Sequence, residues 1–151
     1  MVRQGIDKGN GGQAITPSKR RLLLVDEDLD DLFHYSAVLQ NQGYEVCSIP
    51  SYTDGSDRLA REDFDLAIVS QGSPNFEGRS VLTRAIEGDR FTPVLVLTRS
   101  IEIPCYLEAM QLGALDYLEK PRPVSEIGKL VARHLKARPR AGQARWHAAR
   151  A

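Results

Sequence analysis

Polar side chains stand at the ends of four apolar runs in this sequence. They are Asp26, Glu27 and Asp28 after "RLLLV", Ser70 at the end of "DLAIVS", Thr98 at the end of "TPVLVLT" and Lys120 at the end of "ALDYLEK". Carboxylate oxygens are ligands of hard cations such as Mg²⁺, and a lysine ammonium group balances a phosphate anion. Brought together, these side chains could hold a metal ion and a phosphoryl group.

The elements that must position these residues alternate along the chain, as strands and amphipathic helices. The predicted strands are 21–25, 44–49, 65–70, 92–98 and 114–120, and the predicted helices are 28–43, 51–62, 79–88, 103–113 and 123–137. The third and fourth strands are apolar throughout, which indicates a parallel α/β sheet covered on both faces. Ligands of such open sheets gather at the carboxyl ends of the strands, so the polar set is expected at one rim.

Length and composition indicate one ordinary globular domain. The chain has 151 residues, no apolar run near the ~20 residues of a membrane span, and no signal peptide at its start. Its two cysteines, Cys47 and Cys105, lack metal-binding spacing and are expected to be reduced thiols in the core. These features predict a cytoplasmic protein without a membrane partner.

Charge divides the chain into three parts. Residues 22–136 hold 11 of the 20 basic and 19 of the 20 acidic residues, so the body is acidic and its ends are basic. The expected organisation is a disordered leader at 1–19, a folded domain at 20–137 and a basic tail at 138–151. The acidic body argues against a nucleic-acid-binding face, although the tail leaves open an adaptor that contacts nucleic acid.

Four stretches in order resemble a response-regulator receiver domain of two-component signalling. They are "LLLVDED", "DLAIVSQGSPNFEG", "PVLVLTRS" and "GALDYLEKP". The resemblance implies a flavodoxin-like (βα)5 three-layer sandwich with strand order 2-1-3-4-5. It matches Asp26 and Glu27 to the acid pair that holds the metal, Thr98 and Tyr117 to a switch couple, and Lys120 to the lysine of a Lys-Pro pair. It also implies a signalling module rather than an enzyme.

Ser70 departs from the family pattern. In the family the phosphoaccepting aspartate lies four residues before a proline, and that proline lies four residues before a glycine, so Pro74 and Gly78 place Ser70 at the acceptor position. A serine hydroxyl cannot form an acyl phosphate and is a poor nucleophile without a base. It also removes one anionic ligand from the metal site. We therefore expect weak or absent Mg²⁺ binding at Asp26 and Glu27, and no other cofactor.

Arg99 is a second departure, because receivers usually carry a small residue after the hydroxyl of the fourth strand. Its guanidinium group could pair with Asp26 or Glu27 and block the site, or it could point into solvent. Lys120 is expected to form a structural salt bridge with Asp26. In the family's switch couple, the hydroxyl moves toward the phosphate and the aromatic side chain turns inward. Without a phosphoryl group nothing would cause this movement, so Tyr117 is expected to be a surface aromatic.

The predicted function is an atypical, stand-alone receiver that signals by binding proteins and does not use aspartyl phosphorylation. Two alternatives remain open: phosphorylation by an unusual route, at Ser70 or a neighbouring acid, and the nucleic-acid adaptor. The resemblance implies a histidine kinase or a downstream effector as partner. It also suggests a homodimer through the last helix–strand–helix face, whose residues are Tyr117, Glu119, Arg122 and Lys129.

Overall fold

The computed structural model describes residues 19–120, 124–136, 138 and 141. Ten elements alternate along them. They are β1 (Arg21–Val25), α2 (Leu29–Asn41), β2 (Glu45–Ile49), α3 (Tyr52–Arg61), β3 (Leu66–Ser70), α4 (Arg79–Glu87), β4 (Val94–Thr98), α5 (Ile103–Leu112), β5 (Asp116–Glu119) and α6 (Val124–Lys136). All ten predicted elements are confirmed. The predicted leader, apart from Lys19, and most of the predicted basic tail lie outside the described residues.

Most observed elements are one or two residues shorter than predicted, because capping residues lie outside them. Asp28 is the N-cap of α2 and accepts hydrogen bonds from two backbone amides of the first turn. Ser51 caps α3 in the same way. Gly113 ends α5 with a φ of 106°, a left-handed conformation that glycine adopts without steric cost.

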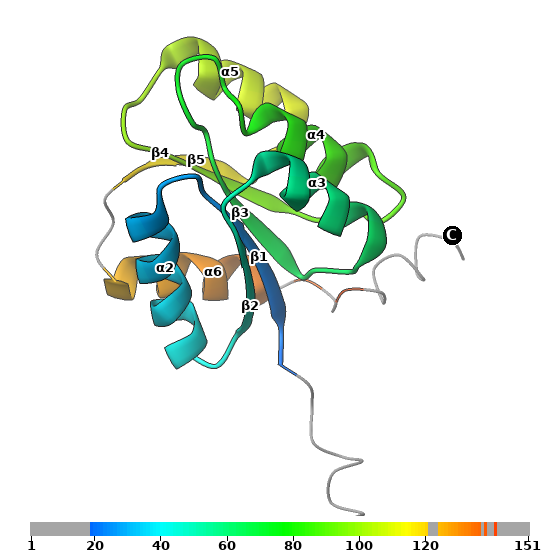
Figure 1. Ribbon diagram of the computed structural model, residues 1–151, viewed down its shortest axis with the longest axis vertical. Helices are drawn as coiled ribbons and strands as arrows, with labels where there is room; N and C mark the ends of the chain where they lie inside the picture. The colour runs from blue at the N-terminus through cyan, green and yellow to red at the C-terminus, as the bar shows by residue number, and fades with distance from the viewer. Residues whose placement is uncertain (1–18, 121–123, 137, 139–140, 142–151) are drawn as a thin grey trace, which may run out of the picture.

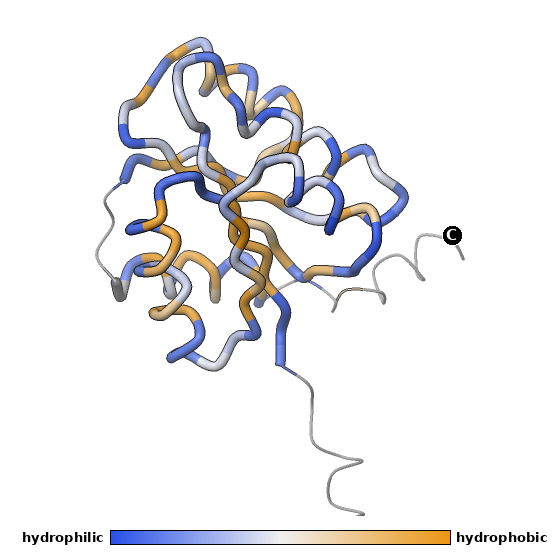
Figure 2. Tube along the Cα trace, in the orientation of Figure 1, coloured by the Kyte–Doolittle hydropathy of each residue, from blue (hydrophilic) through white to orange (hydrophobic). Residues whose placement is uncertain are grey.

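The sheet has five parallel strands in the order β2-β1-β3-β4-β5, which confirms the predicted topology. Figure 1 shows the three layers: α2 and α6 lie on one face of the sheet, and α3, α4 and α5 lie on the other. The strands form the apolar centre of the molecule, as the hydropathy colouring of Figure 2 shows.

Residue size differs between the two faces of the sheet. Alternate residues of a strand point to opposite faces. One face carries mainly leucines, for example Leu22 and Leu24, and packs with Leu39 of α2 and Val131 of α6. Beneath α3, α4 and α5, the other face carries Leu23 of β1 and otherwise smaller residues of β1, β3 and β4, which are Val25, Ala67, Val69, Val94 and Val96. Continuous apolar strands therefore place their polar residues only at their ends.

The chain after α6 returns to the amino-terminal edge of the sheet. The backbone amide of Ala141 donates to Oδ1 of Asp65 at 2.6 Å, and a guanidinium nitrogen of Arg20 donates to the carbonyl of Arg138 at 3.4 Å. This edge is opposite the rim that carries the candidate site. Within the described part of the chain, no helix has the length and apolarity needed to cross a membrane.

Candidate functional site

The sheet topology brings the predicted polar residues to one rim. Strands β1, β3, β4 and β5 are paired in parallel and end level with one another, since Val25 is opposite Val69, Ser70 is opposite Leu97, and Thr98 is opposite Glu119. Asp26 follows β1 directly and Lys120 follows β5 directly. Side chains 94 residues apart in sequence therefore meet at the carboxyl ends of the strands.

Asp26 and Lys120 form a buried ion pair at the centre of this rim. The ammonium nitrogen of Lys120 lies 2.8 Å from Oδ2 of Asp26, and each side chain is 3% exposed. The other carboxylate oxygen of Asp26 accepts the backbone amide of Asp28 at 3.0 Å. Both oxygens of Asp26 are thus engaged by the protein itself, Oδ2 in the salt bridge that the sequence analysis predicts for Lys120 and Oδ1 by a backbone amide.

Arg99 folds over the rim, but it does not contact the residues predicted for it. Its guanidinium group lies 2.8 Å from Oδ2 of Asp28 and 2.7 Å from Oδ2 of Asp31. The predicted pairing with Asp26 or Glu27 is therefore wrong. The reason is geometric: the N-cap and first turn of α2 carry Asp28 and Asp31, three residues apart, and both reach the Arg99 guanidinium group after β4.

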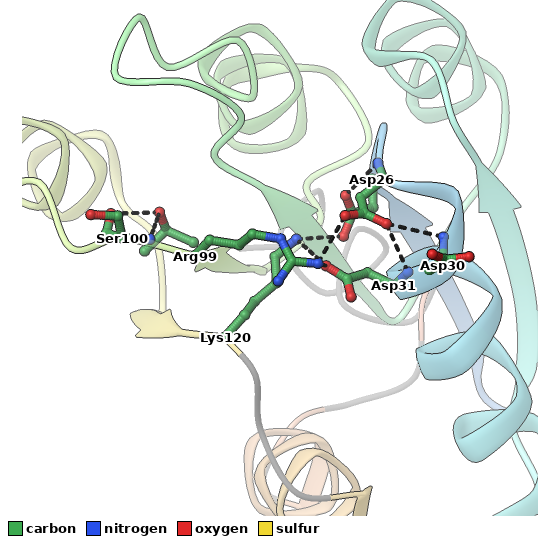
Figure 3. Close-up of polar contacts among 8 residues, drawn as sticks. Asp26, Asp30, Asp31, Arg99, Ser100 and Lys120 are labelled. Atoms are coloured by element: carbon green, nitrogen blue, oxygen red, sulfur yellow. Dashed lines mark hydrogen bonds and ion pairs between the residues drawn. The ribbon is translucent and has the colours of Figure 1, made fainter.

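Asp31 joins the two cations of the rim. Its Oδ2 accepts from Lys120 at 3.0 Å and from Arg99 at 2.7 Å. In Figure 3 both basic side chains extend toward the start of α2, where Asp26 and Asp31 lie. Two cations and the carboxylates of Asp26, Asp28 and Asp31 form one network. Each of these carboxylates is paired with the ammonium group of Lys120, the guanidinium group of Arg99, or both.

Asp28 has a double role in this network. Its Oδ1 caps α2 by accepting the amides of Asp30 and Asp31, and its Oδ2 pairs with Arg99. Hydrogen bonding to Arg99 is the main cause that holds the pKa of the Asp28 carboxyl below its usual range, and the capped backbone amide of Asp31 adds to it. Asp28 is therefore a charged anchor for Arg99.

The residues present do not fit a divalent metal ion. Asp26 has both oxygens engaged, and Glu27, the other predicted ligand, is exposed. Mg²⁺ requires several oxygen ligands in near-octahedral geometry. Among the described residues, no three acidic, histidine or cysteine side chains converge in a way that could hold a metal. The rim is organised around internal cations instead.

Ser70 ends β3 inside the rim and is 6% exposed. Tyr52, the first residue of α3, brings its phenol close to Ser70. Burial raises the pKa of Tyr52 to about 12, and the neighbouring Ser70 hydroxyl opposes this shift in part. A half-buried aromatic side chain therefore lies beside the predicted acceptor position.

The loop after β3 carries Pro74 and Gly78, the residues that place Ser70 at the acceptor position. The amide of Gly78 donates to the carbonyl of Gln71 at 3.0 Å, which closes the loop directly onto the end of the strand. A Cβ atom at Gly78 would collide with the carbonyl oxygen of Ser70. Only glycine allows this approach.

The predicted switch couple is separated. The hydroxyl of Thr98 donates to the carbonyl of Ser100 at 2.8 Å and accepts the Ser100 amide at 3.2 Å, so Thr98 is bonded within its own loop. Tyr117 is 5% exposed, and its hydroxyl donates to Oε1 of Gln71. The prediction of a surface aromatic at Tyr117 is therefore wrong, because Gln71 provides a buried acceptor for its hydroxyl.

Sequence reasoning missed three residues of the rim: Asp31, Gln71 and Tyr52. The spacing of Asp28 and Asp31 at the start of a predicted helix is a usable signal, because residues three apart share a helix face. Gln71 and Tyr52 carry no such signal. Their roles depend on how the loop after β3 and the start of α3 pack together.

Comparison with known proteins identifies the family. The sequence model of the response regulator receiver domain matches residues 22–132. The chain is similar to the two-component response regulator-like protein APRR1 of Arabidopsis thaliana, with 33% identity over 132 residues, which cover 84% of this chain and 21% of that protein. It is also similar to the response regulator protein FleR of Pseudomonas aeruginosa, with 33% identity over 114 residues, which cover 76% of this chain and 24% of that protein. The chain thus spans about a quarter or less of the length of these two relatives.

The fold is also similar to that of a solved receiver domain structure. A CheY-like receiver domain protein of Methanospirillum hungatei superimposes with a TM-score of 0.72 at 24% identity, covering 79% of this chain and 95% of that one. Its likeness concerns the fold, whereas the family match spans the strands and the rim residues described above. This chain belongs to the response regulator receiver domain family.

Proposed function

We propose that this chain is an atypical receiver that signals by binding other proteins and does not form an aspartyl phosphate. The observation that carries the proposal is the engagement of Asp26: both of its oxygens are bonded, one to a backbone amide and one to Lys120. A serine stands at the acceptor position beside it. The site therefore lacks the carboxylate that would be phosphorylated, and Asp26, one of its two predicted metal ligands, is already bonded at both oxygens.

Chemical reasoning on Ser70 supports the same proposal. A serine hydroxyl needs a general base to attack phosphorus, and the described histidines, His34 on α2 and His134 on α6, do not follow a strand end. A protein kinase would need to reach a side chain that is 6% exposed and lies beside Tyr52. Both routes of phosphorylation at Ser70 are therefore disfavoured.

Receiver domains interact with histidine kinases and effectors, and we propose that α5 contributes to the binding face here. Among the described residues, exposed large apolar side chains gather on α5 and just before it: Ile101, Ile103, Tyr106, Leu107 and Met110. Glu119 and Lys129 of the predicted helix–strand–helix face are exposed, whereas Tyr117 is buried and Arg122 lies outside the described residues. A homodimer through this face is part of the proposal, and light scattering at increasing concentration tests it.

The proposal is tested with a small phosphodonor. The wild-type chain is incubated with acetyl phosphate and Mg²⁺ and its intact mass is measured, with an aspartate-bearing receiver treated in parallel as the positive control. We expect a phosphate adduct on the control receiver and none on this chain. An acid-stable adduct that Ser70→Ala removes would establish serine phosphorylation, and a hydroxylamine-labile adduct would establish an acyl phosphate. Either adduct would overturn the proposal.

A further inference from the structure

Gln71, the residue that follows β3, has a side-chain amide that is hydrogen-bonded at both its nitrogen and its oxygen. The residue is 1% exposed. Its backbone amide donates to the carbonyl of Leu97 at 2.7 Å, and its carbonyl accepts the amide of Gly78. The side chain is therefore held by a backbone that is tied both to the neighbouring strand β4 and to the loop that leads to α4.

The orientation of the Gln71 side chain follows from its contacts. Its Nε2 donates to the carbonyl of Ser73 at 3.1 Å. This bond assigns the nitrogen to the Ser73 side and leaves Oε1 facing Tyr117, whose hydroxyl donates to it. A buried amide oxygen without this donor would be unsatisfied, so the inward position of Tyr117 completes the bonding of Gln71.

Tyr117 in turn supports the start of α5. Its hydroxyl accepts the backbone amide of Glu102, the N-cap residue of α5, at 3.1 Å. Its ring packs edge to face against the ring of Tyr106 at a centroid distance of 5.7 Å. The side chain of Glu102 makes no capping bond, so the Tyr117 hydroxyl contributes a tertiary contact at this helix end.

We propose that Gln71 is a built-in latch that holds Tyr117 inward, and with it the first turn of α5, without a phosphoryl group. The latch consists of Gln71, Tyr117 and the Glu102 amide. It sets the position of the exposed apolar residues on α5, namely Ile103, Tyr106, Leu107 and Met110. The inference rests on the proposed function in one respect: a module that binds without phosphorylation requires a face that is already in its binding arrangement.

The latch does not include Thr98 or Ser70, the residues at the switch and acceptor positions of the family. Thr98 is bonded to Ser100 and makes no part of the chain Gln71–Tyr117–Glu102. The side chain of Ser70 is not part of it either. The coupling therefore runs from the loop after β3 to α5 through one amide and one phenol.

The test measures hydrogen exchange at the Glu102 amide by NMR in the ¹⁵N-labelled 151-residue chain. Gln71→Leu removes the acceptor, and Tyr117→Phe removes the hydroxyl while keeping the ring. Each variant is expected to speed hydrogen exchange at Glu102 by about five- to tenfold, and the double variant no further, because the three groups act in series. Tyr106→Phe is the matched control, since it deletes a hydroxyl from the ring beside Tyr117 and leaves the latch intact.

A second measurement uses the wild-type chain alone, so that a poorly folding variant cannot obscure the result. The hydroxyl proton of Tyr117 is expected to exchange slowly and to show a nuclear Overhauser effect to the Glu102 amide. Absence of that contact, or unchanged Glu102 exchange in folded Gln71→Leu, overturns the latch and leaves the mass result with acetyl phosphate unaffected. A phosphate adduct in that experiment overturns the proposed function and leaves these exchange rates as the measure of the latch.

Discussion

Asp26 and Lys120 form an ion pair of 2.8 Å in which each side chain is 3% exposed, although β1 and β5 are not neighbouring strands. The pair spans the carboxyl ends of the sheet and occupies the position that the sequence analysis assigns to metal and phosphate. A buried pair of this kind repays its desolvation only while both partners are present.

Removal of Lys120 is therefore predicted to destabilise the fold strongly. Lys120→Met keeps most of the side-chain volume but leaves Asp26 charged, buried and without its cation, so we expect a loss of about 3–5 kcal/mol. The free energy of unfolding in urea measures it.

Arg99→Met is the matched control, because it removes the other basic side chain of the same network. Arg99 is 56% exposed, and exposed ion pairs contribute little. We expect a much smaller loss than for Lys120→Met. Equal losses in the two variants would show that Asp26 does not depend on its buried partner.

Conversion of Ser70 to an acid is predicted to create a response to Mg²⁺ that the wild-type chain lacks. Ser70→Asp places a second carboxylate near Asp26 in a buried position, and the added charge is expected to cost about 2 kcal/mol. A divalent cation that binds the folded form recovers part of this loss. Thermal unfolding with and without Mg²⁺ measures the recovery.

Ser70→Asn separates charge from size in this experiment. Asparagine has nearly the shape of aspartate but no charge, so its unfolding temperature is expected to be independent of Mg²⁺. The wild-type chain is expected to behave in the same way. A stabilisation by Mg²⁺ in the wild type comparable with that in Ser70→Asp would contradict the conclusion that the rim does not fit a metal.

The strands and the rim follow from the sequence because their signals are local. Continuous apolar runs at 65–70 and 92–98 indicate a parallel sheet, and the first polar residue after each run is then at the rim. Asp26 and Lys120 needed no more than this to be placed at one rim, and the receiver resemblance then suggested their salt bridge. The helix ends were also predictable to within a residue or two, because Asp28 has the side-chain oxygen that an N-cap requires and Gly113 can adopt the left-handed backbone that ends a helix.

The contacts that distinguish this rim depend on packing that has no sequence period. Two arrangements were left open for Arg99, a pairing with Asp26 or Glu27 and a side chain pointing into solvent. The N-cap and first turn of α2 present Asp28 and Asp31 to it instead. Tyr117 was expected at the surface because no phosphoryl group is present to turn it inward. Gln71 provides a buried acceptor for its hydroxyl, and no sequence motif predicts that contact. Both differences arise because tertiary packing supplies a hydrogen-bond or ion-pair partner outside the expected set of residues.

Gly78→Ala is predicted to disturb the end of β3. The added Cβ would meet the carbonyl oxygen of Ser70, a backbone atom that can move only with the strand. We expect a loss of about 1–3 kcal/mol in the free energy of unfolding. Ser80→Ala is the control, because Ser80 is exposed on α4, the helix that Gly78 precedes. Its free energy of unfolding is expected to remain within about 0.5 kcal/mol of the wild type. If Gly78→Ala is as stable as the control, the close approach of α4 to β3 is not required.

Protonation of His134 on α6 is predicted to lower the free energy of unfolding as the pH falls from about 7 to about 5. Burial is the main cause that lowers the pKa of His134 below its ordinary value of 6.5; Arg133 and Arg138 add to the shift, and Asp116 opposes it. Its Nε2 is buried and has no hydrogen-bond partner among the residues that the structure describes. Because the unfolded chain takes up a proton more readily than the folded chain, the contribution of His134 is complete above its unfolded pKa and is lost as the pH falls through the lowered folded value.

His134→Leu removes this titration, so we expect its free energy of unfolding to change less between pH 7 and pH 5 than that of the wild type. The pH range isolates the histidine: the carboxylates whose pKa is lowered, Asp28, Glu62, Glu77 and Glu108, titrate below their ordinary values of 3.8 and 4.5. Urea unfolding at intervals across the range measures the slope, and His34→Gln, at an exposed position on α2, is the control. A slope in His134→Leu equal to that of the wild type would mean that the protonated imidazole is accommodated in the folded chain as easily as in water, and that burial at α6 does not disfavour its charge.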